Sequence, residues 1–404
     1  MSTRLKYLVV SASSCLTVLL LVGSLLGQSS SSREDAYKHI DVFSDVVAHI
    51  KSDYVEEPDM KSVTLGAMNG MLEAIDPFAS YLNADQYRDY LKNKDVKRAD
   101  VGLVLAKLPG YLRVVAAVPG SPAAKAGFST GDMIESIGGV ATRDMPLAYA
   151  YMLLAGEPGS PVDLSVVHVR QLEPQTAKLV RASINLPPVD SSMLPDGVGY
   201  INVDALGPAQ VKQASDAIQK LQKDGARKII VDLRNCAVGD PQNGVALANL
   251  FMNKGLITYL QGQRVTRQNF EADPAKAITT LPVAVLTNRG TASGAEIAAA
   301  AIQDSKRGQV IGEPTFGDAA ERKALTMDDG GAIILSVAKY YSPNGQSIQD
   351  NRVTPAIAVV AAETQIDYDD NGEPLPGTQP QKIEEEKKTP NDPVVKKALE
   401  VLAK

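Results

Sequence analysis

Apolar side chains recur every three or four residues between Glu34 and about Leu91, and this spacing predicts helices. The residues that carry the pattern are Val42, Val46, Val47 and Ile50, and further on Met68, Met71, Leu72 and Ile75. Because proline cannot continue a helix, the Asp76-Pro77 pair is expected to end the second stretch. Residues 34–98 are therefore expected to form an N-terminal helical region.

The pattern changes after Asp100 to short apolar runs of the kind that form strands. Residues 101–105 make a glycine-led apolar strand, and residues 113–118 make a second one. A small β-rich domain is expected over residues 99–172.

From Gly197 to Val360 apolar strands alternate with helical stretches, the pattern of an α/β domain. The expected strands are 198–203, 228–233 and 281–287, and the expected helices are 208–223 and 294–303. The run 228–233 is continuously apolar, so it is expected to be buried on both faces of a sheet. The core is placed at residues 177–362, and the chain as a whole is an α/β multidomain protein.

The two ends of the chain differ from this globular pattern. Arg4 and Lys6 precede an uncharged apolar run, 7–26, and a serine-rich exit follows it. Residues 1–30 are therefore expected to be either a cleaved signal peptide or a retained membrane anchor. The charge bias puts the rest of the chain on the outer face, in the periplasm or cell envelope. Lipidation at Cys15 is disfavoured because the apolar run continues past it.

Residues 363–404 form a polar tail that is rich in proline and charge and ends in an amphipathic stretch, 394–402. Residues 367–372 resemble the first half of a calcium loop. The position of its chelating carboxylate is Thr378, so calcium binding is not expected.

Composition excludes several function classes. The net charge of −6 gives no footprint for nucleic acid. The two cysteines, Cys15 and Cys236, imply no disulfide framework. The three histidines, His39, His49 and His168, have no metal-ligand spacing and none lies in a recognisable catalytic motif. Neither a metal site, a cofactor nor a Ser-His-Asp triad is therefore expected.

The segment Thr291–Ile297, followed by Thr315-Phe316-Gly317-Asp318, resembles the active-site signature of the carboxyl-terminal processing peptidases, also called tail-specific proteases. The segments 74–82, 338–345 and 348–349 resemble further elements of the same family. Gly120–Gly127 with Gly131–Ile134 resembles a PDZ domain of the type common in bacterial proteases. The resemblance implies a crotonase-like α/β protease core with an inserted PDZ domain.

The resemblance also implies roles for individual residues, and here the chain departs from the family. Ser293 stands at the nucleophile position, but Asp318 stands where the family has its general-base lysine. Arg322 stands where the family has the glutamine that orients the lysine. On a strand these two positions face the same way, so we expect an Asp318–Arg322 ion pair in place of the catalytic pair. Lys323 is the nearest lysine and is expected to face the opposite side.

The turn that supplies an oxyanion donor in the family also differs. Residues 232–235 match, but Ala237 replaces the family's proline and Val238 its first glycine, ahead of Gly239. A valine would be strained there if the turn requires a positive φ, and the donor amide would be misdirected; alternatively, the turn tolerates valine. Without a base, Ser293 is open to two interpretations, a nucleophile or a helix N-cap.

A PDZ groove binds a peptide by strand addition, and the amides of its glycine-led loop hold the terminal carboxylate. The corresponding loop here is Val101, Gly102, Leu103 and Val104. The alternative is a PDZ domain that only spaces its neighbours. The sequence leaves two hypotheses. The first is an envelope member of the serine peptidase family that binds protein C-termini for proteolysis, with its catalysis lost or much weakened. The second is a non-catalytic protein that acts as a peptide-binding scaffold or regulator. A homo-oligomer or an active paralogue is a further expected partner.

Overall fold

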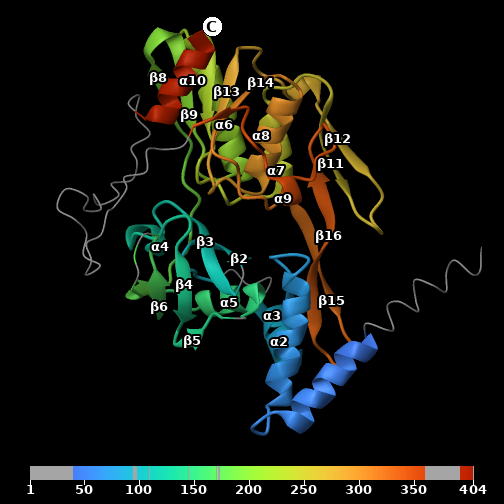
Figure 1. Cartoon of the computed structure of the whole chain (residues 1–404). Helices are drawn as coiled ribbons and strands as arrows, with labels where there is room; N and C mark the ends of the chain where they lie inside the picture. The colour runs from blue at the N-terminus through green and yellow to red at the C-terminus, as the bar shows by residue number, and fades with distance from the viewer. Residues whose placement is uncertain are drawn as a thin grey trace, which may run out of the picture. The chain divides into compact units, whose positions relative to one another are not determined.

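The computed structural model of the 404-residue chain describes residues 40–93, 98–108, 110–143, 145–169, 171, 173–359 and 392–403 (Figure 1). It divides into two compact units, Met1–Ala67 and Met68–Lys404, and each is described by itself. The signal or anchor expected at 1–30, the loop at 367–378 and His39 lie outside the described residues. Among the described residues, no helix combines the length and the apolar character needed to cross a membrane.

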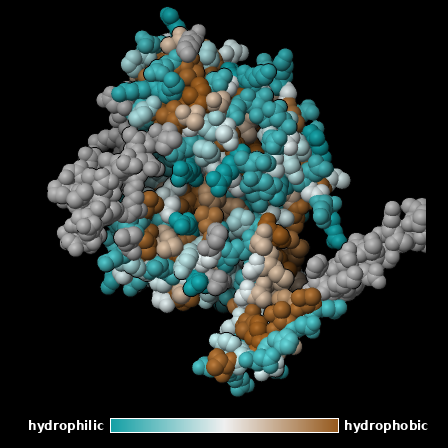
Figure 2. Space-filling view, viewed as in Figure 1, coloured by the Kyte–Doolittle hydropathy of each residue, from teal (hydrophilic) through white to brown (hydrophobic). Residues whose placement is uncertain are grey.

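The first unit contains a helix over residues 40–53. The unit ends at Ala67, within the helix α2 (Met60–Glu73). The helix over residues 40–53 leaves large apolar side chains in solvent, namely Ile40, Val42, Phe43 and Val46. Figure 2 shows apolar surface gathered along this segment. The helical periodicity that predicted this element is confirmed, and among the described residues of the unit these apolar side chains stay exposed.

The second unit begins with the end of α2 and then α3 (Ala84–Asn93), with the short strand β1 (Ser80–Leu82) between them. The expected break at Asp76-Pro77 is confirmed, because the helix ends at Glu73. The Asp76 carboxylate accepts hydrogen bonds from the backbone N–H groups of Phe78 (2.9 Å) and Ser336 (3.3 Å). This turn is therefore fastened to the long β-hairpin of the unit.

The PDZ region forms a sheet in the order β2-β3-β4-β6-β7, with β5 paired to β4. Its elements are β2 (Leu103–Leu108), β3 (Tyr111–Ala117), α4 (Pro122–Lys125), β4 (Met133–Ile137), β5 (Val140–Ala141), α5 (Leu147–Leu154), β6 (Pro161–Val167) and β7 (Gln175–Val180). The alternating apolar positions of the strands and α5 fill one core, which includes Leu105, Leu112, Ile134 and Leu164. In this sheet β2 is an edge strand.

The α/β layer is a second sheet in the order β17-β14-β13-β10-β9-β8. Its strands are β8 (Asp190–Leu194), β9 (Val198–Asn202), β10 (Lys228–Asp232), β13 (Val283–Thr287), β14 (Gly308–Gly312) and β17 (Ile357–Ala358). Only β8 pairs antiparallel with its neighbour. The apolar run predicted as a doubly buried strand is β10, which lies in the interior of the sheet between β9 and β13.

Helices cover both faces of this sheet. The first core cluster gathers residues of α6 (Pro208–Lys223), α7 (Pro241–Asn249) and α8 (Gly294–Asp304). α10 (Pro393–Ala403) packs in a separate cluster with Tyr200, Ile230 and Leu286 of the strands. A Cβ at Gly244 would meet the Gly294 carbonyl oxygen at 2.0 Å, so glycine is required where α7 and α8 cross.

The third sheet has the order β1-β16-β11-β12, and β15 also pairs with β16. Its remaining strands are β11 (Leu256–Gln261), β12 (Gln268–Glu271), β15 (Ala320–Thr326) and β16 (Ala332–Tyr341), followed by the short helix α9 (Ile348–Asn351). Figure 1 shows the β15–β16 hairpin running from the α/β layer toward α3 within the second unit. The second unit thus combines a small β-rich region, a mixed α/β layer and a third sheet.

Candidate active site

Ser293 lies at the N-cap of α8, in a backbone conformation that few residues other than glycine adopt (φ 56°, ψ −124°). A sharp turn of this kind between a strand and a helix lifts the serine side chain clear of the backbone. The Ser293 hydroxyl donates a hydrogen bond to the Gly239 carbonyl oxygen at 2.8 Å. The serine is therefore presented as a nucleophile would be, while its proton is held by a carbonyl rather than by a base.

Glu296 connects the serine turn to the Thr-Phe-Gly-Asp turn. Its side chain is fully buried, and its carboxylate accepts from the Ser293 N–H (3.0 Å), the Gly317 N–H (2.7 Å), the Asp318 N–H (2.7 Å) and the Thr315 hydroxyl. Burial raises the pKa of Glu296 to about 7, against the opposite effect of these donors. The sequence analysis assigned Glu296 no role, although its position three residues after Ser293 is the signal of a capping carboxylate.

Asp318 and Arg322 form the expected ion pair, with Nη2 and Oδ1 2.5 Å apart. The strand alternation invoked for it was wrong in detail, because Asp318 precedes β15 and the register shifts between Glu321 and Arg322. The Arg322 guanidinium also lies over the Phe78 ring, 4.1 Å from its centroid. Both charged groups at the base and orienter positions thus have partners.

No other described base lies at the serine in a recognisable arrangement. Lys323 is exposed and pairs in register with Leu335 on β16. His168 lies in the PDZ region, with Nδ1 2.8 Å from the Asp132 carboxylate, and His49 contacts Asp53 within its own helix at 2.7 Å. Within the described part of the chain, no group of three His, Cys, Asp or Glu side chains could hold a metal ion.

The oxyanion turn corrects one expectation. Val238 is not among the described non-glycine residues with a positive φ; the positive values fall on Asn235 (60°) and Gly239 (150°). Val238 is held by its carbonyl, which accepts from the Leu206 N–H at 2.7 Å. A Cβ at Gly239 would meet the Leu206 carbonyl oxygen at 2.4 Å, so glycine is retained where it is needed. The expected strain at Val238 is therefore absent.

The same turn is anchored from behind by Arg234. Its guanidinium bonds the Asp232 carboxylate at 2.7 Å and the Asp392 carboxylate at 2.5 Å, and all three side chains are buried. Tyr200 donates to Asp232 at 2.7 Å. Because Asp392 precedes α10, this network ties the C-terminal helix to the turn that carries Gly239.

The loop expected to bind peptides has its own local contacts. Gly102 has a φ of 80°, and a Cβ there would meet the Ser121 Cβ at 2.3 Å, so the conformation requires glycine. The Gly102 N–H already donates to the Asp100 carboxylate at 2.7 Å. Val101 and Leu103 are buried and Val104 is partly buried. The amide expected to hold a terminal carboxylate is thus bonded to a carboxylate of the chain itself.

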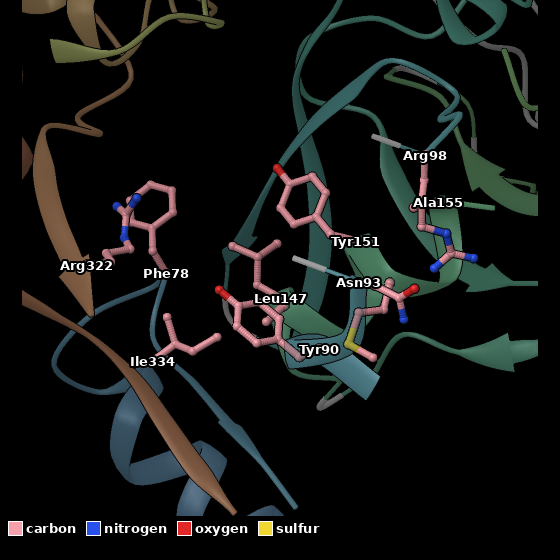
Figure 3. A pocket seen from close by; sticks show the side chains of 11 residues that line it. Phe78, Tyr90, Asn93, Arg98, Leu147, Tyr151, Ala155, Arg322 and Ile334 are labelled. Atoms are coloured by element: carbon pink, nitrogen blue, oxygen red, sulfur yellow. The ribbon is translucent and has the colours of Figure 1, made fainter. Parts of the chain in front are cut away.

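Two cavities meet at Arg322. One, of about 510 Å³, is mainly apolar and is lined by Phe78, Leu147, Tyr151 and Ile334 among others (Figure 3). The other, of about 390 Å³, is lined by polar and aromatic side chains that include Asp240, Glu321 and Tyr340. Arg322, the partner of Asp318, therefore lines both the apolar and the polar cavity.

Comparisons with known proteins agree with this arrangement. The sequence profile of Peptidase family S41 matches residues 197–359, and that of the PDZ domain matches 113–167. The carboxy-terminal processing protease CtpA of Bacillus subtilis is 30% identical over 338 residues, 83% of this chain and 71% of that protein. The carboxyl-terminal-processing protease of Synechocystis sp. is 32% identical over 314 residues, 76% of this chain and 73% of that protein.

Among solved structures, the photosystem II D1 C-terminal processing protease superposes with a TM-score of 0.64 at 26% identity. The match covers 79% of this chain and 92% of that one. The chain belongs to Peptidase family S41, among its PDZ-containing carboxy-terminal processing proteases.

Proposed function

We propose that this protein binds protein C-termini through its PDZ domain and that its own peptide hydrolysis is lost or much weakened. The observation that carries the proposal is the Asp318–Arg322 ion pair, 2.5 Å long, at the positions that would hold the base and its orienter. A carboxylate that is engaged by a guanidinium is a poor acceptor for a serine proton.

The surroundings of Ser293 offer no replacement. Its hydroxyl donates to a peptide carbonyl, which is far too weak a base to remove the proton. The Glu296 carboxylate already accepts four hydrogen bonds, with both oxygens in use. Binding of a substrate is thus supported better than its cleavage.

A second candidate function is hydrolysis with a base recruited from elsewhere. The strained turn at Ser293 favours it, because the strain presents the serine hydroxyl as a nucleophile would be presented. The two candidates differ in one measurement, the labelling of Ser293 by a fluorophosphonate probe. We expect little labelling of the wild type, and none of Ser293→Ala. Rapid labelling of the wild type, together with Ser293-dependent cleavage of an unfolded protein, would establish the second candidate instead.

Peptide binding is tested separately by comparing a free C-terminal carboxylate with its amide. Binding at the loop 101–104 requires the acid to bind more tightly, because backbone amides stabilise a negative charge. Equal affinities would argue against a C-terminal mode. Neither result depends on the chemistry at Ser293.

Location and assembly are part of the proposal. Residues 1–30 direct the chain to the periplasm or cell envelope as a signal peptide or anchor, and a phosphatase fused after Ser32 should be active. The exposed apolar face of helix 40–53 supports a homo-oligomer or pairing with an active paralogue. A monomeric mass of the purified protein in light scattering would exclude the homo-oligomer. The crotonase-like class of the core and the boundaries 34–98, 99–172, 177–362 and 363–404 belong to the same proposal.

A further inference from the structure

The outer edge of β2 is where a peptide strand would add to the PDZ sheet. In the register with β3, Leu105 lies opposite Val114, whose own N–H and C=O bond to Asp132 and Gly131 on the other side. The N–H and C=O of Leu105 therefore point away from β3, toward the open edge. The register shifts between Val104 and Leu105, but the extra residue lies on β3, so backbone groups still alternate along β2. The Gly102 carbonyl accepts from the Val118 N–H on the β3 side, and the groups of Leu103 therefore point to the open edge.

Tyr151 of α5 occupies this edge. Its hydroxyl accepts a hydrogen bond from the Leu105 N–H at 2.8 Å and donates one to the Leu105 carbonyl oxygen at 3.2 Å. One hydroxyl thus satisfies both groups that an added strand would use at this position. A row of edge groups would otherwise be open for pairing with another chain.

A second contact of the chain with itself lies three residues earlier. The Asp100 carboxylate accepts from the Gly102 N–H at 2.7 Å, in the loop expected to receive a terminal carboxylate. A carboxylate at the loop and a donor–acceptor pair at Leu105 reproduce the contacts of a bound C-terminal peptide. The two contacts come from different elements, so they are independent observations.

We propose that Tyr151 is an internal competitor for the peptide: its hydroxyl holds the groove between β2 and α5 closed, and an extended C-terminal segment binds by displacing it from Leu105. The proposal deepens the proposed function and rests on it. Asp100 competes in the same way for the Gly102 N–H, where the terminal carboxylate of the peptide would bind. The groove then binds only those ligands whose backbone hydrogen bonds are more favourable in free energy than the Tyr151 and Asp100 contacts that they replace.

The displaced ring has space to occupy. Tyr151 lines the cavity of about 510 Å³ together with Leu147 of the same helix. Phe78 and Arg322 stand across that cavity from Tyr151 (Figure 3). The cavity therefore gives a ring that leaves Leu105 room to move into.

The test compares the full wild-type chain with Tyr151→Phe, which keeps the ring and removes the hydroxyl. Tyr90→Phe is the matched control, because Tyr90 lines the same cavity from α3. Amide hydrogen exchange should become faster at Leu105 in Tyr151→Phe and stay unchanged in the control. A fluorescein-labelled decapeptide ending in Ala-Leu-Val, with a free carboxylate, should bind Tyr151→Phe roughly twofold to tenfold more tightly than the wild type, as expected for one released hydrogen-bonding group.

A second measurement does not require the variant to bind. In 3-fluorotyrosine-labelled wild-type protein, the fluorine resonance of Tyr151 should shift on addition of the peptide, while that of Tyr90 should shift less. Equal affinities of wild type and Tyr151→Phe, or a fixed Tyr151 resonance in the peptide complex, would overturn the competitor role and leave the proposed function standing. Failure of both chains to bind the decapeptide would overturn the competitor role together with the proposed function.

Discussion

Glu296 should make the stability of this protein fall as the pH rises through neutrality. Its carboxylate is fully buried, and burial raises its pKa from 4.5 to about 7 in the folded state. The folded chain therefore keeps a proton at pH values where the unfolded chain has released it. The stabilisation is complete below the unfolded value of 4.5 and is lost as the pH rises to about 7 and above.

The size of the effect follows from the shift. A change from 4.5 to about 7 corresponds to about 3 kcal/mol, since one pKa unit is about 1.4 kcal/mol. The neighbouring Asp318 carboxylate also raises the pKa of Glu296. The four donors to the carboxylate work in the opposite direction and are already contained in the net value.

The assay is denaturant unfolding of wild type and Glu296→Gln between pH 5 and pH 8. The chain has no tryptophan, so circular dichroism is the appropriate signal. Glutamine does not titrate, and the difference between the two proteins therefore cancels the contribution of every other group. We expect the stability of the wild type relative to the variant to fall by about 3 kcal/mol, mostly between pH 5 and pH 7. A difference that is constant or rises with pH would show that the four donors outweigh burial and that Glu296 is a carboxylate throughout.

Three further predictions concern the site. The double change Asp318→Lys with Arg322→Gln should raise fluorophosphonate labelling of the serine by roughly a hundredfold, whereas Asp318→Lys alone, facing an arginine, should gain much less; equal gains would deny the orienting role. Gly239→Ala should lower the unfolding free energy by roughly 2–4 kcal/mol, because its φ of 150° and close contacts exclude a side chain; a wild-type melting curve would contradict this. Asp392→Ala should cost roughly 2–4 kcal/mol and speed amide exchange in the C-terminal helix, since it strips the buried Arg234 of one partner; unchanged exchange there would mean that the helix docks without the pair.

The hydrophobic pattern of the sequence was sufficient to predict those helices and strands whose conformation is decided by their own residues. The helix expected over 208–223 is confirmed as α6, because its apolar face and the proline at its first turn are both local signals. The strands of the third sheet, such as β11 and β12, were not assigned, since their pairing with distant segments decides them. The ion pair at the base position was predicted from spacing, although the strand was wrongly assumed to begin at Asp318.

The residues that the sequence analysis missed act through long-range contacts. Glu296 became important only when the turn at 315–318 folded onto it from about twenty residues away. In the sequence Tyr151 is one more apolar position of a helical stretch. The role of its hydroxyl depends on a hydrogen bond with Leu105, 46 residues earlier, which local pattern does not predict. The sequence left two alternatives for Val238, strain or a tolerant turn, because local pattern does not tell which residue of the turn takes the positive φ; in the structure it is the neighbouring Gly239.

The fold of the site does not require a lysine at position 318, because the turn is held through backbone groups. Glu296 holds position 318 through its N–H, so the carboxylate clamp does not depend on which side chain is present there. The side chain at 318 must only find a partner in a partly buried place, and Arg322 supplies one while packing on Phe78. The contacts of Glu296 and the Asp318–Arg322 pair therefore support the turn and the helix start without a lysine at position 318. In the proposed function, peptide binding at the loop 101–104 and hydrolysis at Ser293 depend on different residues, so the first can persist without the second.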